Sequence, residues 1–307
     1  MSQVLKISKQ TEYLPVQTAV SIGKFDGLHL GHQSLIAAIL KEKENGYSSC
    51  IVSFSTTVDS KRSVIYTKKE QRKLCEAIGI DVIAEYPFDE IKDMTAERFV
   101  ADILMSRLQA RVIVVGEDFR FGKDRTGDVE LLKRLESKYG YRTVCISTVN
   151  ESDLRISSTG IRSLLKEGNV KEANKLLGRP YGIFGEVLHG KQLGRTLGFP
   201  TMNLIPPEEK LLPAYGVYLT KTKVDGLWYD GITNIGIRPT VDYNERVSVE
   251  THLFSYEGDL YGKRVEVQFL EFLRPEQKFS DVEQLKNAIH EDFVKAKGVL
   301  EKYSEIV

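Results

Sequence analysis

The 307-residue sequence has few cysteines and no long apolar run. Its three cysteines, Cys50, Cys75 and Cys145, are far apart and form no Cys-x-x-Cys pair, which argues against zinc and a disulfide framework. Basic and acidic side chains number 43 each, so no net charge attracts nucleic acid as the main ligand. No segment approaches the ~20 apolar residues of a membrane span, and residues 1–14 lack the apolar core of a signal peptide. We therefore expect a cytoplasmic protein that acts on small molecules, without membrane attachment and of open oligomeric state.

The length allows two domains of about 150 residues, each with its own core. Short apolar runs alternate with amphipathic helical patterns from residue 18 to about residue 148. The expected strands span residues 18–22, 49–54, 81–86, 111–115 and 141–147, and the expected helices span residues 33–43 and 95–108 or begin at the caps Thr67 and Asp128. Such alternation predicts a doubly wound α/β sheet, which binds ligands at the carboxyl ends of its strands.

The pattern changes after a helical segment at residues 170–177 and a Gly178-Arg179-Pro180 break. Beyond it, apolar residues alternate with polar ones and glycines recur at short intervals, which predicts an antiparallel β domain. A final amphipathic helix, residues 281–302, is expected to cover this domain through four apolar side chains: Leu285, Ile289, Phe293 and Val294. We place the domains at residues 1–180 and 181–307.

The turn at residues 23–32 joins the first predicted strand to the first predicted helix. Gly27 and Gly31 leave room beside His29 and His32, and the free N–H groups of the following helix favour an anion. Two imidazoles three residues apart can donate to phosphate oxygens, so the turn suits a nucleotide triphosphate. A tight turn with two surface histidines fits the same residues. A metal pair is disfavoured, since no third ligand lies nearby at useful spacing.

Two more segments bear on the same predicted edge of the sheet. Residues 116–122 follow the fourth predicted strand and are therefore expected to line the same crevice. An ordinary loop whose aromatic side chains only fill the core would have the same sequence pattern. Ser157, Ser158 and Thr159 open a helix with Arg162 one turn inside it, and such a helix end grips phosphate. A plain N-cap would need only one hydroxyl.

Together these segments resemble a known family. The His-x-Gly-His stretch resembles the signature of the nucleotidylyltransferase superfamily, and Gly-x-Phe-Asp-Gly-x-His-x-Gly-His with Ser-Ser-Thr-x-Ile-Arg resembles the flavin branch, the bifunctional riboflavin kinase/FMN adenylyltransferases. Class I aminoacyl-tRNA synthetases share the first motif, but their Lys-Met-Ser-Lys-Ser loop is absent. The resemblance implies a Rossmann-like domain with catalytic residues His29, His32 and Arg162; ATP contacts at Gly23, Phe25, Asp26, Gly27, Gly31, Ser157, Ser158 and Thr159; and flavin contacts at Asp118, Phe119, Arg120 and Phe121.

A second chemical region begins at Gly185. Its spacing is close to a Walker A loop, but Gly194, Gly198 and Pro200 forbid the helix that such a loop must open. The run Gly-Arg-x-Leu-Gly-Phe-Pro-Thr-x-Asn resembles the riboflavin kinase signature instead. This resemblance implies a β-barrel kinase domain with ATP contacts at Gly190, Gly194, Arg195, Thr201 and Asn203, Mg²⁺ held by Thr201 and Asn203, and Glu250 as the flavin-binding base for the riboflavin 5′-hydroxyl.

Two departures from the family pattern affect the first domain. Lys24 stands where the family more often has asparagine, and a cation at this position is compatible with bound phosphate. The second departure is that no Pro-His-Pro follows Phe54. We therefore expect riboflavin phosphorylation and FMN adenylylation with ATP and Mg²⁺, with riboflavin, FMN and FAD as substrates or products. Two alternatives remain: a riboflavin kinase with a weakened adenylylation site, and a non-catalytic flavin- or nucleotide-sensing protein.

Overall fold

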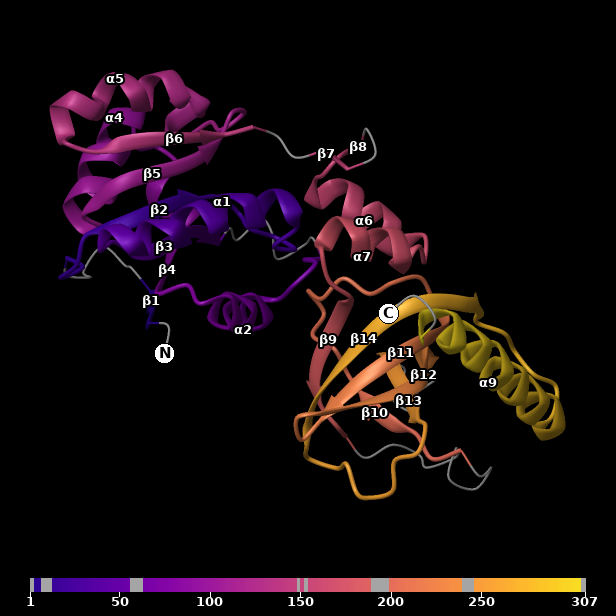
Figure 1. Cartoon of the computed structure of the whole chain (residues 1–307). Helices are drawn as coiled ribbons and strands as arrows, with labels where there is room; N and C mark the ends of the chain where they lie inside the picture. The colour runs from indigo at the N-terminus through magenta and orange to yellow at the C-terminus, as the bar shows by residue number, and fades with distance from the viewer. Residues whose placement is uncertain are drawn as a thin grey trace. The chain divides into compact units, whose positions relative to one another are not determined.

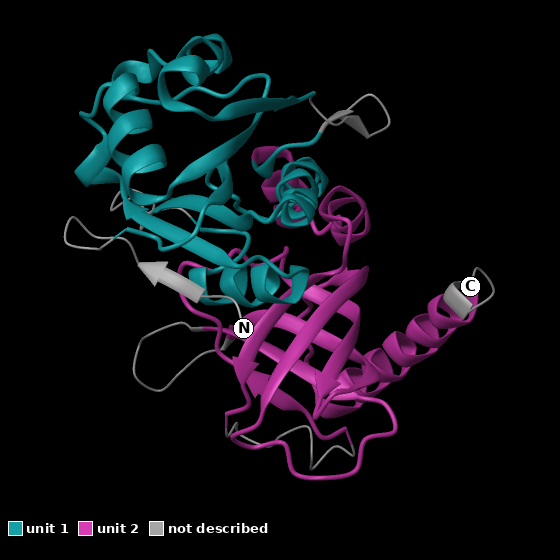
Figure 2. Ribbon diagram, turned by 60° about the vertical axis from the view of Figure 1, so that its left-hand side comes forward, with its two compact units in different colours: residues 1–158 teal, residues 159–307 magenta. Residues whose placement is uncertain are grey.

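The computed structural model describes residues 3–6, 13–55, 63–147, 150–151, 154–188, 199–238 and 246–304. Contacts divide the chain into two units, residues 1–158 and 159–307 (Figure 2). The domain boundary at residue 180 stays a prediction, because the division by contacts assigns residues 159–180 to the second unit.

The first unit is built on a six-stranded sheet in which all neighbouring strands are parallel (Figure 1). Its strand order is β1-β4-β3-β2-β5-β6. The strands are β1 (Gln3–Lys6), β2 (Thr18–Ile22), β3 (Ser48–Ser55), β4 (Val82–Pro87), β5 (Ala110–Gly116) and β6 (Arg142–Ile146). From β2 the chain adds β3 and β4 on one side and later β5 and β6 on the other, so the order reverses beside β2. In such sheets a crevice opens at the carboxyl ends of the strands where the order reverses.

Both faces of this sheet are buried, as the continuous apolar strands predicted. In β2, Val20 packs in the core under η3 and α5, whereas its neighbour Ala19 packs in the core under α1 and α2. The helical elements are α1 (Leu30–Lys41), η1 (Glu42–Asn45), α2 (Lys68–Ile78), α3 (Phe88–Ile91), α4 (Ala96–Arg98), the π-helical η3 (Phe99–Arg107), η4 (Lys123–Arg125) and α5 (Val129–Tyr139). Thr67 and Asp128 cap α2 and α5, so both predicted helix starts are confirmed. The unit is therefore the expected doubly wound α/β domain.

The second unit contains a six-stranded antiparallel sheet in the order β10-β13-β12-β11-β14-β9. The strands are β9 (Tyr181–Glu186), β10 (Met202–Leu204), β11 (Gly216–Val224), β12 (Leu227–Arg238), β13 (Arg246–Leu253) and β14 (Arg264–Pro275). The sheet curls so that the chain after β9 meets the other edge strand, where Leu188 N donates to Asn203 O at 2.9 Å (Figure 2). Tyr181, Tyr218 and Phe269 are fully buried in its interior. This half-barrel is the predicted antiparallel β domain.

Helix α9 (Val282–Ser304) packs on the outer face of the half-barrel, but one of its expected contacts is wrong. Its buried face carries Ile289, Phe293, Ala296 and Leu300, which recur at helical spacing. Val294 is 61% exposed, because it lies one residue past Phe293 and so points about 100° away around the helix axis. A bidentate ion pair, with Arg274 Nε and Nη2 each 2.8 Å from an oxygen of the buried Asp292, ties the helix to β14.

Two further helices, α6 (Ser158–Lys166) and α7 (Val170–Leu177), precede β9. Helix α7 is fixed to the half-barrel by Asn174, whose Nδ2 donates to Phe269 O at 2.8 Å and whose Oδ1 accepts from Tyr181 N at 2.6 Å. A two-stranded ribbon of β7 (Asn150–Glu151) and β8 (Leu154–Arg155) lies before α6. In the described part of the chain, no helix combines the length and apolar character that crossing a bilayer requires.

Candidate active sites

A cavity of about 290 Å³ opens in the first unit where the strand order reverses. Its walls come from the ends of β2, β5 and β6, the start of α1 and the chain just before α6. The residues that line it are Ile22, Gly23, Phe25, His29, Gly31, His32, Leu35, Gly116, Asp118, Phe119, Ile146, Ser147, Ile156, Ser157 and Ser158. The structure therefore brings together side chains from all three predicted segments of this site.

The two histidines lie face to face at the start of α1. Their ring centroids are 3.7 Å apart with an interplanar angle of 17°, and His29 is the N-cap residue whose Nδ1 accepts from His32 N at 3.3 Å. Because Nδ1 accepts, a neutral His29 carries its proton on Nε2, which makes Nε2 a donor. A Cβ at Gly31 would lie 3.3 Å from His29 Nδ1, so a larger residue would crowd this cap. The sequence did not indicate this cap, since N-caps are usually Ser, Thr, Asp or Asn.

The backbone of the turn before α1 is held in an uncommon conformation. Phe25, Gly27 and Leu28 have positive φ angles of 50°, 87° and 44°. Phe25 is fully buried, and its ring centroid lies 5.1 Å from that of His32. Its ring therefore packs against the imidazole, and the residue also lines the cavity. Gln71 on α2 donates to Phe25 O at 3.1 Å, a stabilising contact that no motif indicated.

Asp26 and Gly27, two of the predicted ATP contacts, do not line this cavity. Asp26 Oδ1 accepts from Ile65 N at 2.9 Å, and Asp26 O accepts from Ser158 Oγ at 2.8 Å. The Asp26 carboxylate thus fixes the turn against the segment before α2. An ATP contact at Asp26 or Gly27 stays a prediction.

The loop after β5 divides its residues between the cavity and the core. Asp118 and Phe119 line the cavity. Phe121 is buried in the core and stacks on Phe119, with ring centroids 5.4 Å apart. Arg120 is exposed and donates from Nη1 to Phe119 O at 2.9 Å. Flavin contacts by Asp118, Phe119, Arg120 and Phe121 stay predictions.

The helix that carries Arg162 straddles the division between the units. Ser157 and Ser158 line the cavity in the first unit, whereas Thr159 and Arg162 belong to the second. Thr159 is exposed at the start of α6. Phosphate contacts by Thr159 and Arg162 stay predictions.

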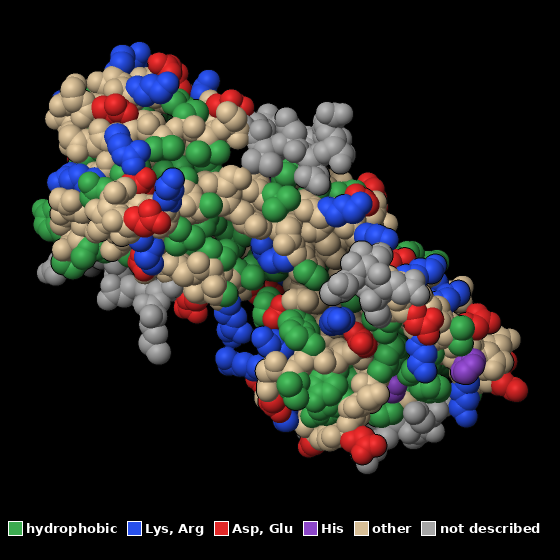
Figure 3. Space-filling view, viewed as in Figure 1, with side chains coloured by type: hydrophobic (Ala, Val, Ile, Leu, Met, Phe, Trp, Pro, Cys, Tyr) green, Lys and Arg blue, Asp and Glu red, His purple; other side chains and the backbone are tan. Residues whose placement is uncertain are grey.

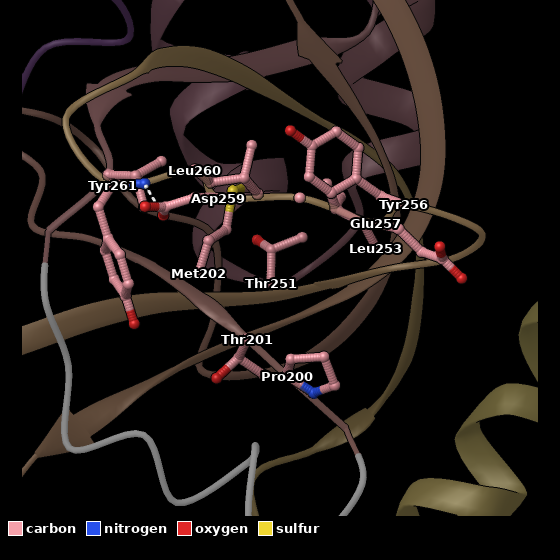
Figure 4. Close-up of a pocket in the computed structure, with 12 residues that line it drawn as sticks. Pro200, Thr201, Met202, Thr251, Leu253, Tyr256, Glu257, Asp259, Leu260 and Tyr261 are labelled. Carbon is pink, nitrogen blue, oxygen red and sulfur yellow. Dashed lines mark hydrogen bonds between the residues drawn. The ribbon is translucent and has the colours of Figure 1, made fainter.

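The second unit has a larger cavity of about 650 Å³ at one end of the half-barrel (Figure 4). Its lining residues are Val187, Pro200, Thr201, Met202, Thr251, Leu253, Tyr256, Glu257, Gly258, Asp259, Leu260 and Tyr261. In this view Thr251 and Met202 lie in the middle, with Thr201 and Pro200 below them, Tyr261 on the left and Tyr256 on the right. Tyr261 N donates to Asp259 Oδ1 at 2.9 Å, which stabilises the lining segment at residues 256–261. Thr201 is thus the predicted nucleotide-binding residue that lines this cavity, whereas Gly190, Gly194 and Arg195 fall outside the described residues.

Glu250 and Asn203 are direct partners across neighbouring strands. Asn203 on β10 is in register with Glu250 on β13, which is in register with Asn234 on β12. Register partners point to the same face of a sheet, so these three side chains form a polar row. Ser248 Oγ donates to Glu250 Oε1 at 3.3 Å, and Asn203 is buried. Successive residues of a strand point to opposite faces of the sheet, and Thr251, the neighbour of Glu250, lines the cavity. The polar row therefore lies on the outer face of the half-barrel and not inside the cavity.

A chain of hydroxyls runs beneath the cavity. Thr251 and Thr233 are joined at 2.8 Å, Thr233 and Thr220 at 2.8 Å, and Thr220 Oγ1 donates to Gly231 O at 3.2 Å. A carbonyl can only accept and each hydroxyl has one proton, so Thr233 donates to Thr220 and Thr251 donates to Thr233. The chain therefore has a single direction, and Thr251 keeps only its acceptor lone pairs for other contacts.

Charged side chains of both signs are intermixed on the face shown in Figure 3. This agrees with the equal numbers of basic and acidic residues in the sequence. Phosphate groups must therefore be bound by a few local donors and not by a basic surface. Among the described residues, no group of three His, Cys, Asp or Glu side chains could hold a metal ion.

Comparisons with known proteins find a family match for each half of the chain. The FAD synthetase family matches residues 12–160, and the riboflavin kinase family matches residues 177–300. The bifunctional riboflavin kinase/FMN adenylyltransferase of Pseudomonas fluorescens is 36% identical, covering 91% of this chain and 92% of its own length. The chain belongs to the bifunctional riboflavin kinase/FMN adenylyltransferase family. The Escherichia coli (strain K12) riboflavin kinase/FMN adenylyltransferase is 35% identical over 91% of each chain.

A solved structure from Streptococcus pneumoniae, described as a macrolide-efflux protein, has the same fold. It is 29% identical with a TM-score of 0.85, covering 96% of this chain and 98% of its own. Its name refers to drug efflux, whereas the motifs and both family matches of this chain concern flavins and nucleotides.

Proposed function

We propose that this chain converts riboflavin to FMN in its second unit and FMN to FAD in its first, using ATP in both reactions. The observation that carries the proposal is the pair of family matches, one over each half of the chain, together with full-length relatives that bear both activities in their names. The two cavities support it, because each is lined by residues of the corresponding motif.

In the first unit, a phosphate oxygen of FMN attacks the α-phosphorus of ATP, the α–β P–O bond breaks, and pyrophosphate leaves. The chemistry needs no covalent enzyme intermediate, only positioning and donors for the charge that moves onto the leaving oxygens. His29 and His32 at the start of α1 supply such donors, and the helix N-terminus adds its own N–H groups. Ser157, Ser158, Thr159 and Arg162 complete the phosphate site, and Asp118 and Phe119 contact the flavin.

In the second unit, Glu250 takes the proton of the riboflavin 5′-hydroxyl while its oxygen attacks the γ-phosphorus, and ADP leaves. The register of β10 with β13 supports this role, because it sets Asn203 directly beside Glu250. The flavin then lies on the outer face and the nucleotide extends from Thr201 into the cavity.

Magnesium fits the donors at the start of β10. Thr201 and Asn203 offer two neutral side-chain oxygens two residues apart, which suits an ion that takes most of its ligands from water and phosphate. When bound there, Mg²⁺ would neutralise phosphate charge. We further infer that the protein acts in the cytoplasm on these small molecules alone.

Phosphorus labelling tests the two reactions separately. With ATP labelled at the γ-phosphorus and riboflavin, label should enter FMN; with ATP labelled at the α-phosphorus and FMN, label should enter FAD. Label in FMN without label in FAD would favour the kinase-only alternative, for which the motivating observation is the lack of Pro-His-Pro after Phe54. No transfer in either reaction would favour the non-catalytic alternative.

A further inference from the structure

His252 lies two residues beyond Glu250 on β13, on the same face of the strand. Its Nδ1 is 2.8 Å from Pro200 O, in the segment that leads into β10. Because a carbonyl oxygen can only accept, Nδ1 is the protonated nitrogen of the neutral ring. Burial also lowers the pKa of this imidazole below its ordinary value, which favours the neutral form.

Three phenylalanines hold the ring of His252 in place. Its centroid is 5.8 Å from that of Phe199, 6.2 Å from that of Phe254 and 5.5 Å from that of Phe293 on α9. These neighbours come from the segment before β10, the end of β13 and the terminal helix. The imidazole therefore packs among aromatic rings from three segments of the chain, and its hydrogen bond to Pro200 has one direction.

The acceptor of this hydrogen bond, Pro200 O, belongs to a residue that lines the cavity of the second unit. Proline has no N–H, so the carbonyl is the only backbone group with which Pro200 can be anchored. The peptide plane of that carbonyl continues directly into Thr201, and both residues line the cavity. The bond from His252 thus sets the orientation of the peptide that carries the Thr201 hydroxyl.

We propose that His252 is a positioning residue of the riboflavin kinase reaction: by donating from Nδ1 to Pro200 O, it holds Thr201 in place for the Mg²⁺-nucleotide relative to Glu250 on its own strand. The proposal rests on the kinase function proposed above. It assigns His252 no contact with substrate. Its effect should appear in the use of ATP and not in the binding of riboflavin.

The test compares substitutions that place an N–H at different points. In His252→Asn the side-chain NH₂ can occupy the position of Nδ1, whereas in His252→Gln it lies farther out, near the position of Nε2. His252→Leu removes the donor and keeps an apolar side chain of similar size. His290, an exposed histidine of α9, provides the matched control His290→Leu.

Riboflavin phosphorylation is measured with varied ATP and varied riboflavin, and FMN adenylylation and melting temperature are measured on the same proteins. His252→Gln and His252→Leu should lower kcat/KM for ATP roughly tenfold, the value of a lost hydrogen bond that positions a reacting group. KM for riboflavin should stay within about twofold, and His252→Asn should retain kcat/KM for ATP within about threefold. His290→Leu should match the unaltered chain in every measurement.

Several results would overturn the role. Unchanged ATP kinetics in the Gln and Leu variants would do so, as would an Asn variant that falls as far as the Gln variant. If His252→Leu fails to fold, the Asn and Gln pair still decides, because both are polar and differ in where the donor lies. An unaltered chain without kinase activity would overturn the proposed function and this role together, whereas an active chain with unaffected variants would overturn the role alone.

Discussion

At the scale of single residues, neighbours give three histidines three different roles. His29 caps a helix through Nδ1, His32 stacks on it, and His252 donates to a proline carbonyl. From the spacing of His29 and His32 the sequence predicted two donors for phosphate, but not the stacking of their rings. It could not predict the cap or the role of His252, because both depend on backbone atoms whose positions spacing does not encode.

His32→Ala should lower FAD formation about a hundredfold, the usual cost of removing one donor to a developing oxyanion, roughly 3 kcal/mol. The loss should appear in kcat more than in KM for ATP, because the donor gains strength as charge moves onto pyrophosphate. The cap of α1 should survive, since it uses the backbone N–H of His32. Steady-state assays of both reactions check this, with riboflavin phosphorylation as the internal control.

His29→Ala serves as the comparison for that variant. It should lose FAD synthesis and also destabilise the first unit by about 1 kcal/mol through loss of the cap. The double variant His29→Ala/His32→Ala should lack FAD synthesis. If it forms FAD within twofold of the normal rate, the two histidines are excluded as donors in the adenylylation reaction.

Glu250→Gln should lower riboflavin phosphorylation by ~10² or more, because a general base typically contributes that much. FMN adenylylation should stay near its original rate, since Glu250 lies in the other unit. Rates of both reactions on the same preparation provide the measurement. Equal losses would show that the two sites are coupled, and an unchanged kinase rate would exclude Glu250 as the base.

At the scale of elements, buried strands were predictable and exposed or edge elements were less so. The five predicted strands of the first sheet form, because their apolar runs fit strands covered on both faces. Strand β1 was missed, since it is a four-residue edge strand within a mixed polar segment. Val294 on α9 was misplaced because an apolar residue one position off a helical stripe cannot be recognised without the partner surface.

The hydroxyl chain under the second cavity yields a matched pair of substitutions. Thr233→Val should destabilise the second unit by about 1–3 kcal/mol, since it removes the acceptor of the buried Thr251 hydroxyl and the donor to Thr220, which keeps only its bond to Gly231 O. Thr222→Val should cost nothing, because its buried Oγ1 has no partner among the described residues and valine keeps the shape. Urea unfolding of both variants gives the comparison. Equal stabilities would show that the chain of hydroxyls contributes nothing.

For the molecule as a whole, each cavity lies within one unit, although the division of the chain falls inside the motif at residues 157–162. The Gly178-Arg179-Pro180 break marks a change of pattern, yet α7 before it is hydrogen-bonded to β14 and to the start of β9. Side-chain hydrogen bonds from a helix to backbone atoms of the next sheet give no sequence signal. The predicted boundary at residue 180 would cut these contacts.

Residues 159–307 expressed alone should therefore fold and phosphorylate riboflavin, because this unit has its own core and cavity. Residues 181–307 should do the same with lower stability, since they lack Asn174 and the buried Leu177. Thermal melts and kinase assays of the two fragments compare them. An inactive longer fragment, beside an active full chain, would show that the kinase needs the first unit.

One chain thus carries out two successive reactions, which we assign to two separate sites. The most direct measurement is a time course in which the purified chain receives riboflavin, ATP and magnesium, and FMN and FAD are resolved chromatographically. Our account predicts that FMN forms first and FAD follows, with pyrophosphate released in step with FAD. Accumulation of FMN without FAD would contradict the assignment of the first unit, and the formation of neither flavin would contradict the account as a whole.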